Sequence, residues 1–100
     1  MEDKKQEQNI AISVYRQIAI DIARNIANGK YVQGEILFGR SVLASQYKVS
    51  PETIRKAIHL LTDIGILETQ KGRGVEVVSV QKAEKFIQRY SSLQNMASIK

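Results

Sequence analysis

The fold is decided by six residues, 48–53, which read Lys48-Val49-Ser50-Pro51-Glu52-Thr53. Serine is one of the residue types whose side-chain oxygen accepts a hydrogen bond from a free N–H group in the first turn of a helix. Proline is favoured at the first helical position because its missing N–H would have no partner there. The negative charge of Glu52 in the first turn interacts favourably with the helix dipole. A helix is therefore predicted to begin at Pro51.

Apolar residues continue this helix at helical spacing as far as Gly65, a residue type that often ends helices. They are Ile54, Ala57, Ile58, Leu61 and Ile64. A shorter helix is predicted over Arg40–Tyr47, so only residues 48–50 separate the two. A short helix, a tight turn and a longer helix form the helix-turn-helix pattern.

The flanking segments complete a small domain. An amphipathic helix is predicted over Ser13–Asn28, and Glu35–Phe38 reads as a single strand or an extended connector. Two strands, Ile66–Gln70 and Val75–Val80, flank the glycine-containing turn Lys71–Gly74 and predict a β-hairpin with a basic tip. The expected fold class is mainly α with a small β-hairpin: a winged helix-turn-helix with a three-helix core plus a wing, followed by a C-terminal helix.

The chain divides into three parts. Residues 1–11 are polar and lack periodicity, which predicts a disordered arm, and residues 12–80 form the winged-helix domain. Residues 81–100 carry apolar side chains spaced alternately by three and four. These are Ala83, Phe86, Tyr90, Leu93 and Ala97. The spacing predicts a dimerisation helix or a linker to a further domain; a helix packed back on the domain's own core is the open alternative.

The composition argues against an enzyme. One hundred residues suffice for one small domain, and the absence of cysteine removes thiolate chemistry and cysteine-ligated zinc. The single histidine is His59, and the carboxylates show no paired or metal-binding spacing. No metal or cofactor is expected.

No targeting or membrane segment is recognised. Residues 1–9, MEDKKQEQN, have no apolar stretch like that of a signal peptide, and no apolar run approaches the roughly 20 residues that span a bilayer. A cytoplasmic protein without membrane contact is expected.

A formal charge of +5 favours a polyanionic partner, most often nucleic acid. On the helix from Pro51, polar and basic residues lie opposite the apolar stripe. These are Glu52, Thr53, Arg55, Lys56 and His59. The major groove of double-stranded DNA, about 12 Å wide, admits such a helix with its N-terminal residues at the base edges.

Individual roles follow from the chemistry of each group. Arg55 suits a bidentate pair with guanine, and Thr53 suits a base, a thymine methyl or a phosphate. The helix N-terminus near Ser50 suits a phosphate, and Lys71 and Arg73 suit a minor groove or the DNA backbone. Two alternatives remain: ordinary solvated side chains, and a winged-helix protein-interaction module without specific DNA binding.

From Val14 to Val80 the sequence resembles the GntR family of winged-helix transcription regulators. The matches in register are Tyr15-Arg16-Gln17-Ile18, Gly29-Lys30-Tyr31, Gly34-Glu35, Leu43-Ala44, Val49-Ser50, Thr53-Ile54-Arg55-Lys56-Ala57-Ile58, Leu61, Gly65-Ile66-Leu67-Glu68 and Gly72-Arg73-Gly74-Val75. The resemblance implies a repressor that binds a pseudo-palindromic operator as a homodimer. The residues expected at the DNA are Arg40, Ser41, Ser50, Pro51, Glu52, Thr53, Arg55, Lys56, His59, Lys71, Arg73 and Gly74.

The sequence departs from the family's pattern at several positions. Where the family usually has Leu-Pro-Ser-Glu-Arg, this chain has Leu37-Phe38-Gly39-Arg40-Ser41, so the family's DNA-contacting arginine falls on Ser41. Pro51 and Glu52 stand where the family often has arginine and threonine, so the operator is expected to differ from the commonest types. Lys48 replaces a usual turn glycine, at a cost of about 1 kcal/mol if that position is left-handed.

Residues 38–55 look like a narrower branch of the family, in which the winged helix and a coiled helix precede a TrkA-C-type ligand domain. This resemblance implies cyclic di-AMP as the effector and control of osmolyte or potassium uptake. No such ligand domain is present in these 100 residues, so the effector would bind outside them.

Overall fold

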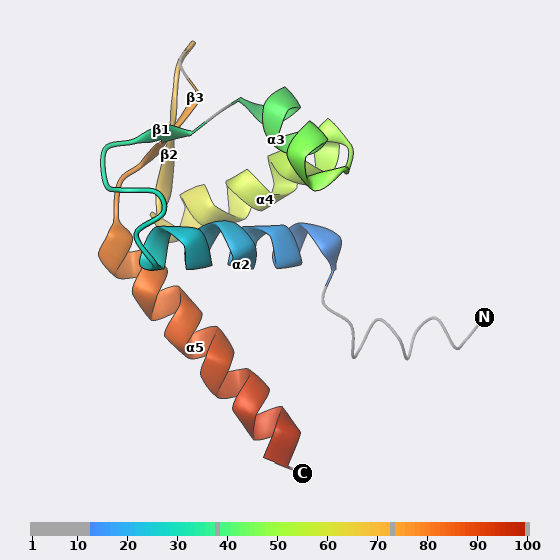
Figure 1. The fold of residues 1–100 in the computed structure, drawn as a ribbon, viewed down its shortest axis with the longest axis vertical. Helices are drawn as coiled ribbons and strands as arrows, with labels where there is room; N and C mark the ends of the chain where they lie inside the picture. Colours follow the sequence, from blue (N-terminus) through green and yellow to red (C-terminus); the bar gives the residue numbers. More distant parts are fainter. Residues whose placement is uncertain (1–12, 38, 73, 100) are drawn as a thin grey trace, which may run out of the picture.

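A computed structural model describes residues 13–37, 39–72 and 74–99, with side chains as far as residue 90. In chain order its elements are α2 (Val14–Ala27), β1 (Ile36–Leu37), α3 (Arg40–Tyr47), α4 (Pro51–Ile64), β2 (Leu67–Gln70), β3 (Gly74–Val77) and α5 (Val80–Ile99). Helices α2, α3 and α4 pack together, the sheet lies at one end of them, and α5 runs away from the sheet (Figure 1). The expected winged helix-turn-helix class is confirmed.

Helix α4 begins and ends where the sequence predicts. Ser50 adopts an extended backbone, and its hydroxyl oxygen accepts a hydrogen bond of 3.2 Å from the Thr53 N–H. Pro51 occupies the first turn, and Gly65 ends the helix with a left-handed φ of 95°. The cap and the glycine stop fix the length of the helix, and its apolar stripe faces the core.

The turn between α3 and α4 contains a strained residue. Lys48 has φ 58° and ψ 46°, and among the described residues other than glycine it alone has a positive φ. The Lys48 N–H donates to the Ser45 carbonyl at 3.3 Å, and the Val49 N–H donates to the Ala44 carbonyl at 3.0 Å. These bonds satisfy the last carbonyl groups of α3, and Lys48 therefore accepts a conformation that glycine adopts more easily.

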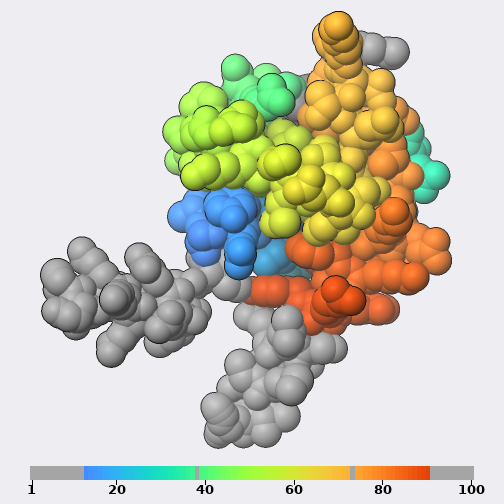
Figure 2. Space-filling view, turned by 180° about the vertical axis from the view of Figure 1, so that it is seen from behind, coloured from blue at the N-terminus to red at the C-terminus, as the bar shows by residue number. Residues whose placement is uncertain are grey.

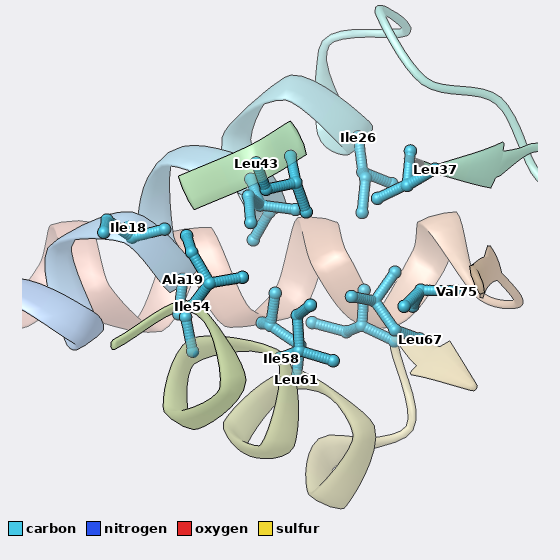
Figure 3. Packing of buried hydrophobic residues seen from close by; sticks show 14 of the residues in the cluster. Ile18, Ala19, Ile26, Leu37, Leu43, Ile54, Ile58, Leu61, Leu67 and Val75 are labelled. Atoms are coloured by element: carbon cyan, nitrogen blue, oxygen red, sulfur yellow. The ribbon is translucent and has the colours of Figure 1, made fainter. Parts of the chain in front are cut away.

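The core lies between α2, α3, α4, the sheet and the first turns of α5 (Figure 3). Seven large side chains in it are almost completely buried: Ile22, Ile26, Ile54, Leu61, Ile66, Leu67 and Val77. At the edge of the core, the Tyr47 hydroxyl donates a 2.7 Å hydrogen bond to the carboxylate of Asp21, which ties α3 to α2. Burial raises the pKa of Tyr47 above its ordinary value, and the bond to Asp21 adds to this, so the donor proton is retained.

The wing is larger than predicted. β1 pairs antiparallel with β3, so the sheet has the order β1-β3-β2, and the predicted hairpin gains a third strand. The predicted strand Val75–Val80 was too long, because β3 ends at Val77. The Ser79 hydroxyl accepts a 3.1 Å hydrogen bond from the Lys82 N–H and so caps the start of α5. Helix α5 thus begins at Val80, one residue before the predicted range.

Gly74 is the first residue of β3 and lies against the end of β1. Its φ is 109°, and a Cβ atom placed there would lie 2.8 Å from the carbonyl oxygen of Leu37. Gly72, at the tip of the same hairpin, has a φ of 72° and open space around it. The two glycines therefore separate backbone strain alone from strain combined with a steric clash.

We expect Gly74→Ala to lower the free energy of unfolding by roughly 2–3 kcal/mol, because strain and the clash with Leu37 act together. The matched variant Gly72→Ala should cost only about 1 kcal/mol. Urea unfolding followed by circular dichroism measures both. Equal losses in the two variants would contradict the close contact between β1 and β3.

Replacing Lys48 by glycine should raise the free energy of unfolding by about 0.5–1 kcal/mol, because the left-handed strain disappears while the unfolded chain gains some freedom. Lys48→Ala removes the same side chain but keeps the strain, so it serves as the control and should give no gain. The same urea titration measures both variants. A stabilisation by alanine as large as that by glycine would show that the side chain, not the backbone, is responsible.

Candidate nucleic-acid interface

The first turn of α4 carries a connected set of polar side chains. The hydroxyl groups of Ser50 and Thr53 lie 3.1 Å apart, within hydrogen-bond distance. Ser50 is exposed and Thr53 is half-buried. The hydrogen bond to Ser50 orients the threonine hydroxyl at the surface. The same serine caps the helix, so one residue both starts α4 and orients a polar group at its surface.

Beside it, Arg55 and Glu52 form an ion pair one turn apart. The Arg55 Nε donates to Glu52 Oε1 at 3.1 Å, and the terminal nitrogen Nη2 donates to Oε2. Their side chains are 54% and 57% exposed, so both remain accessible to a partner. The hydrogen bond from Arg55 lowers the pKa of Glu52 below its ordinary value, and the same bond raises the pKa of Arg55. Both groups are therefore charged at neutral pH.

Farther along α4 the surface becomes less basic. Lys56 is exposed, with its ammonium nitrogen 6.0 Å from the centre of the Tyr15 ring. His59 is also exposed, but its Nε2 lies 3.9 Å from the carboxylate of Asp63. Glu52, Arg55 and Lys56 together leave the first two turns of α4 with a net positive charge, whereas Asp63 adds a negative charge farther along the helix.

The other predicted contact residues lie on α3, at the start of α4 and on the wing, apart from one outside the described residues. Arg40 and Ser41 are exposed at the start of α3, and Pro51 is exposed at the start of α4. Lys71 is exposed on the wing, whereas Arg73 lies outside the described residues. Gly74 is half-buried, and its fit against Leu37 gives it a packing role independent of any DNA contact.

The helix-turn-helix and the wing share one face. Figure 2 shows the surfaces of α3 and α4 (green to yellow) beside the projecting wing (orange-yellow). Figure 1 shows the wing and the start of α4 at the end of the molecule opposite the C-terminal end of α5. One straight partner could therefore contact both.

The predicted dimerisation residues separate into two groups. Ala83 is completely buried in the domain's own core, and Phe86 packs half-buried against it. Tyr90 is also half-buried, while the side chains of Leu93 and Ala97 lie outside the described part of the chain. The first turns of α5 therefore follow the open alternative of a helix packed on its own domain, and pairing through the remainder stays a prediction.

Sequence reasoning missed two features. The Glu52–Arg55 pair was signalled by opposite charges three residues apart on a helix, a spacing at which side chains meet. The second is a shallow depression of about 340 Å³ between α4 and α5, lined by Ile64, Lys82, Lys85, Phe86 and Arg89. Basic residues recurring at helical spacing along α5 were the available signal for it.

Within the described ranges, no group of three histidine, cysteine, aspartate or glutamate side chains could hold a metal ion. Those ranges also contain no helix that is long and apolar enough to cross a membrane.

A capped helix with an exposed polar first turn, joined by a tight turn to a shorter helix and flanked by a wing with the exposed Lys71, defines the winged helix-turn-helix class of DNA-binding domains. The family model described as "Bacterial regulatory proteins, gntR family" matches residues 14–77. The chain belongs to this family.

Relatives of known function are transcription regulators, not enzymes. The regulator TreR of Bacillus subtilis (strain 168) is 36% identical over 76 residues, which cover 76% of this chain and 30% of TreR. S. agalactiae BusR, solved in complex with its busAB-promotor DNA, is 37% identical in sequence and superposes with a TM-score of 0.76. The match covers 88% of this chain and 46% of the BusR chain. The AraR DNA-binding domain, solved in complex with operator ORR3, is 32% identical in sequence and superposes with a TM-score of 0.65. The match covers 68% of this chain and 82% of the AraR chain. This chain therefore spans less than a third of TreR and less than half of BusR.

Lys71→Ala should weaken binding to all duplex sequences alike, because we expect the exposed lysine on the wing to contact phosphates rather than bases. The slope of log K against log salt should become shallower by about one per protomer. Fluorescence anisotropy with random duplex DNA at several salt concentrations measures the slope. Lys85→Ala, on α5, is the control of equal charge change, and an equal effect from it would contradict contact by the wing.

Proposed function

We propose that this chain is the operator-reading part of a repressor that binds a pseudo-palindromic DNA site as a dimer. The observation that carries the proposal is the exposed polar first turn of α4, which lies on one face with the wing. The similarity to BusR and AraR, both solved with DNA, supports it. In this arrangement two copies of α4 enter successive major grooves, about 34 Å apart.

Arg55 reads a guanine through two parallel hydrogen bonds, and the fixed hydroxyl of Thr53 contacts a base or a phosphate. Helix α3 and the wing position the protein on the backbone through Arg40 and Lys71, with Arg73 as a further predicted contact. These contacts combine sequence-independent attraction with sequence reading, which a specific regulator needs.

Dimerisation is proposed through the part of α5 beyond its packing on the core, with help from α2 or residues 1–11. The support is the length of α5, which continues to Ile99 after its first turns are buried. The apolar spacing from Tyr90 through Leu93 to Ala97 continues along that part.

The regulated process is proposed from the sequence of residues 38–55, which look like the family branch with a TrkA-C-type domain. On this basis the effector is cyclic di-AMP, bound outside these residues, and the regulated genes serve osmolyte or potassium transport. Calorimetry with the full-length gene product and cyclic di-AMP tests the effector, with cyclic di-GMP as the control. Equal or absent binding of the two would contradict the proposal.

Arg55→Ala should weaken binding to the operator by about 1–3 kcal/mol and relax the preference at one base pair. The operator is first obtained by selection from a random DNA pool with the full-length gene product, and affinities are then measured by gel-shift titration. Arg24→Ala, an exposed arginine on α2, is the control and should leave the affinity unchanged. Unchanged affinity in Arg55→Ala would refute the assignment, and equal weak binding of wild type to all duplexes would refute a specific regulator.

A further inference from the structure

The Glu52–Arg55 pair uses one particular edge of the guanidinium. A guanidinium has five N–H donors: one on Nε and two on each terminal nitrogen. Glu52 accepts from Nε at 3.1 Å and from the terminal nitrogen Nη2, which together form the side edge of the planar group. The end edge, formed by the two terminal nitrogens, is left open by this geometry.

The open edge matches what guanine offers. In the major groove guanine presents two acceptors, N7 and O6, which arginine contacts with two roughly parallel N–H groups. Two N–H groups on the end edge point in parallel, away from the carboxylate. Arg55 can therefore contact guanine without releasing Glu52.

The surroundings leave Glu52 available for this task. The cap of α4 is supplied by Ser50, which already accepts from the Thr53 N–H at 3.2 Å. Glu52 lies within the attractive field of both Arg55 and Lys56, which adds to the lowering of its pKa. Its carboxylate is therefore ionised and held on Arg55 rather than used to start the helix.

We infer that Glu52 is a positioning residue that stays paired with Arg55 on DNA and directs the open edge of the guanidinium at a single guanine. This inference rests on the proposed function. Glu52 would then increase the preference of Arg55 for that guanine through two effects. The pair fixes the arginine before binding, and its carboxylate repels phosphates that an unpaired arginine would attract at any sequence.

The test uses Glu52→Gln in the full-length gene product, with Asp63→Asn as the matched control. Asp63 lies on the same helix and its variant removes the same charge, but it pairs with His59 rather than Arg55. Affinities are measured for the selected operator and for the operator with the guanine read by Arg55 replaced. We expect Glu52→Gln to lower the ratio of these affinities about tenfold, and Asp63→Asn to leave it within about twofold.

A double-mutant cycle with Arg55→Ala separates positioning from direct base contact. If Glu52 acts through Arg55, Glu52→Gln has no further effect on the ratio once Arg55 is alanine. An unchanged ratio in Glu52→Gln alone, or an equal loss in both backgrounds, would overturn the inference while the regulator itself still stands. If wild type prefers no duplex, the proposed function fails and the inference falls with it. If Arg55→Ala changes nothing, the assignment of Arg55 fails, and the inference falls while the regulator still stands.

Discussion

The hydrogen bond between the Thr53 N–H and the Ser50 hydroxyl is the constraint on which the rest of the molecule depends. It fixes where α4 starts, and the apolar stripe of the helix sets its rotation against the core. Ile54, Ala57, Ile58 and Leu61 then face the core, and Glu52 and Arg55 face outward.

The tight turn before that cap has an energetic cost that the chain tolerates. Lys48 occupies the left-handed region that glycine enters freely, and the strain is offset by the bonds that close α3 and by the burial of Leu43 and Ala44 beneath the turn. The Tyr47–Asp21 hydrogen bond further holds α3 on α2. The angle between α3 and α4 is therefore set by several independent contacts.

The parts of the fold set by local chemistry were predictable from sequence, and the parts set by distant contacts were not. The Ser50 cap and the Gly65 stop gave the bounds of α4, and the apolar spacing gave those of α3. The two-residue β1 becomes a strand only by pairing with β3, and the length of β3 depends on the Ser79 cap, whose competition with the valine run was not evident. At the candidate site, periodicity identified the outward residues, but which of them pair depends on rotamers. The apolar spacing of α5 does not distinguish the domain's own core from a partner, and Ala83 resolves this only for the first turns.

The burial of Ala83 has a mechanical consequence. A residue with no exposed surface, one turn into a helix that starts directly from the Ser79 cap, leaves no swivel between sheet and helix. Helix α5 is 20 residues long, about 30 Å, and the domain is rigidly attached to its first turns. A tilt of α5 applied near Ile99 would therefore be transmitted through its buried first turns to the helix-turn-helix.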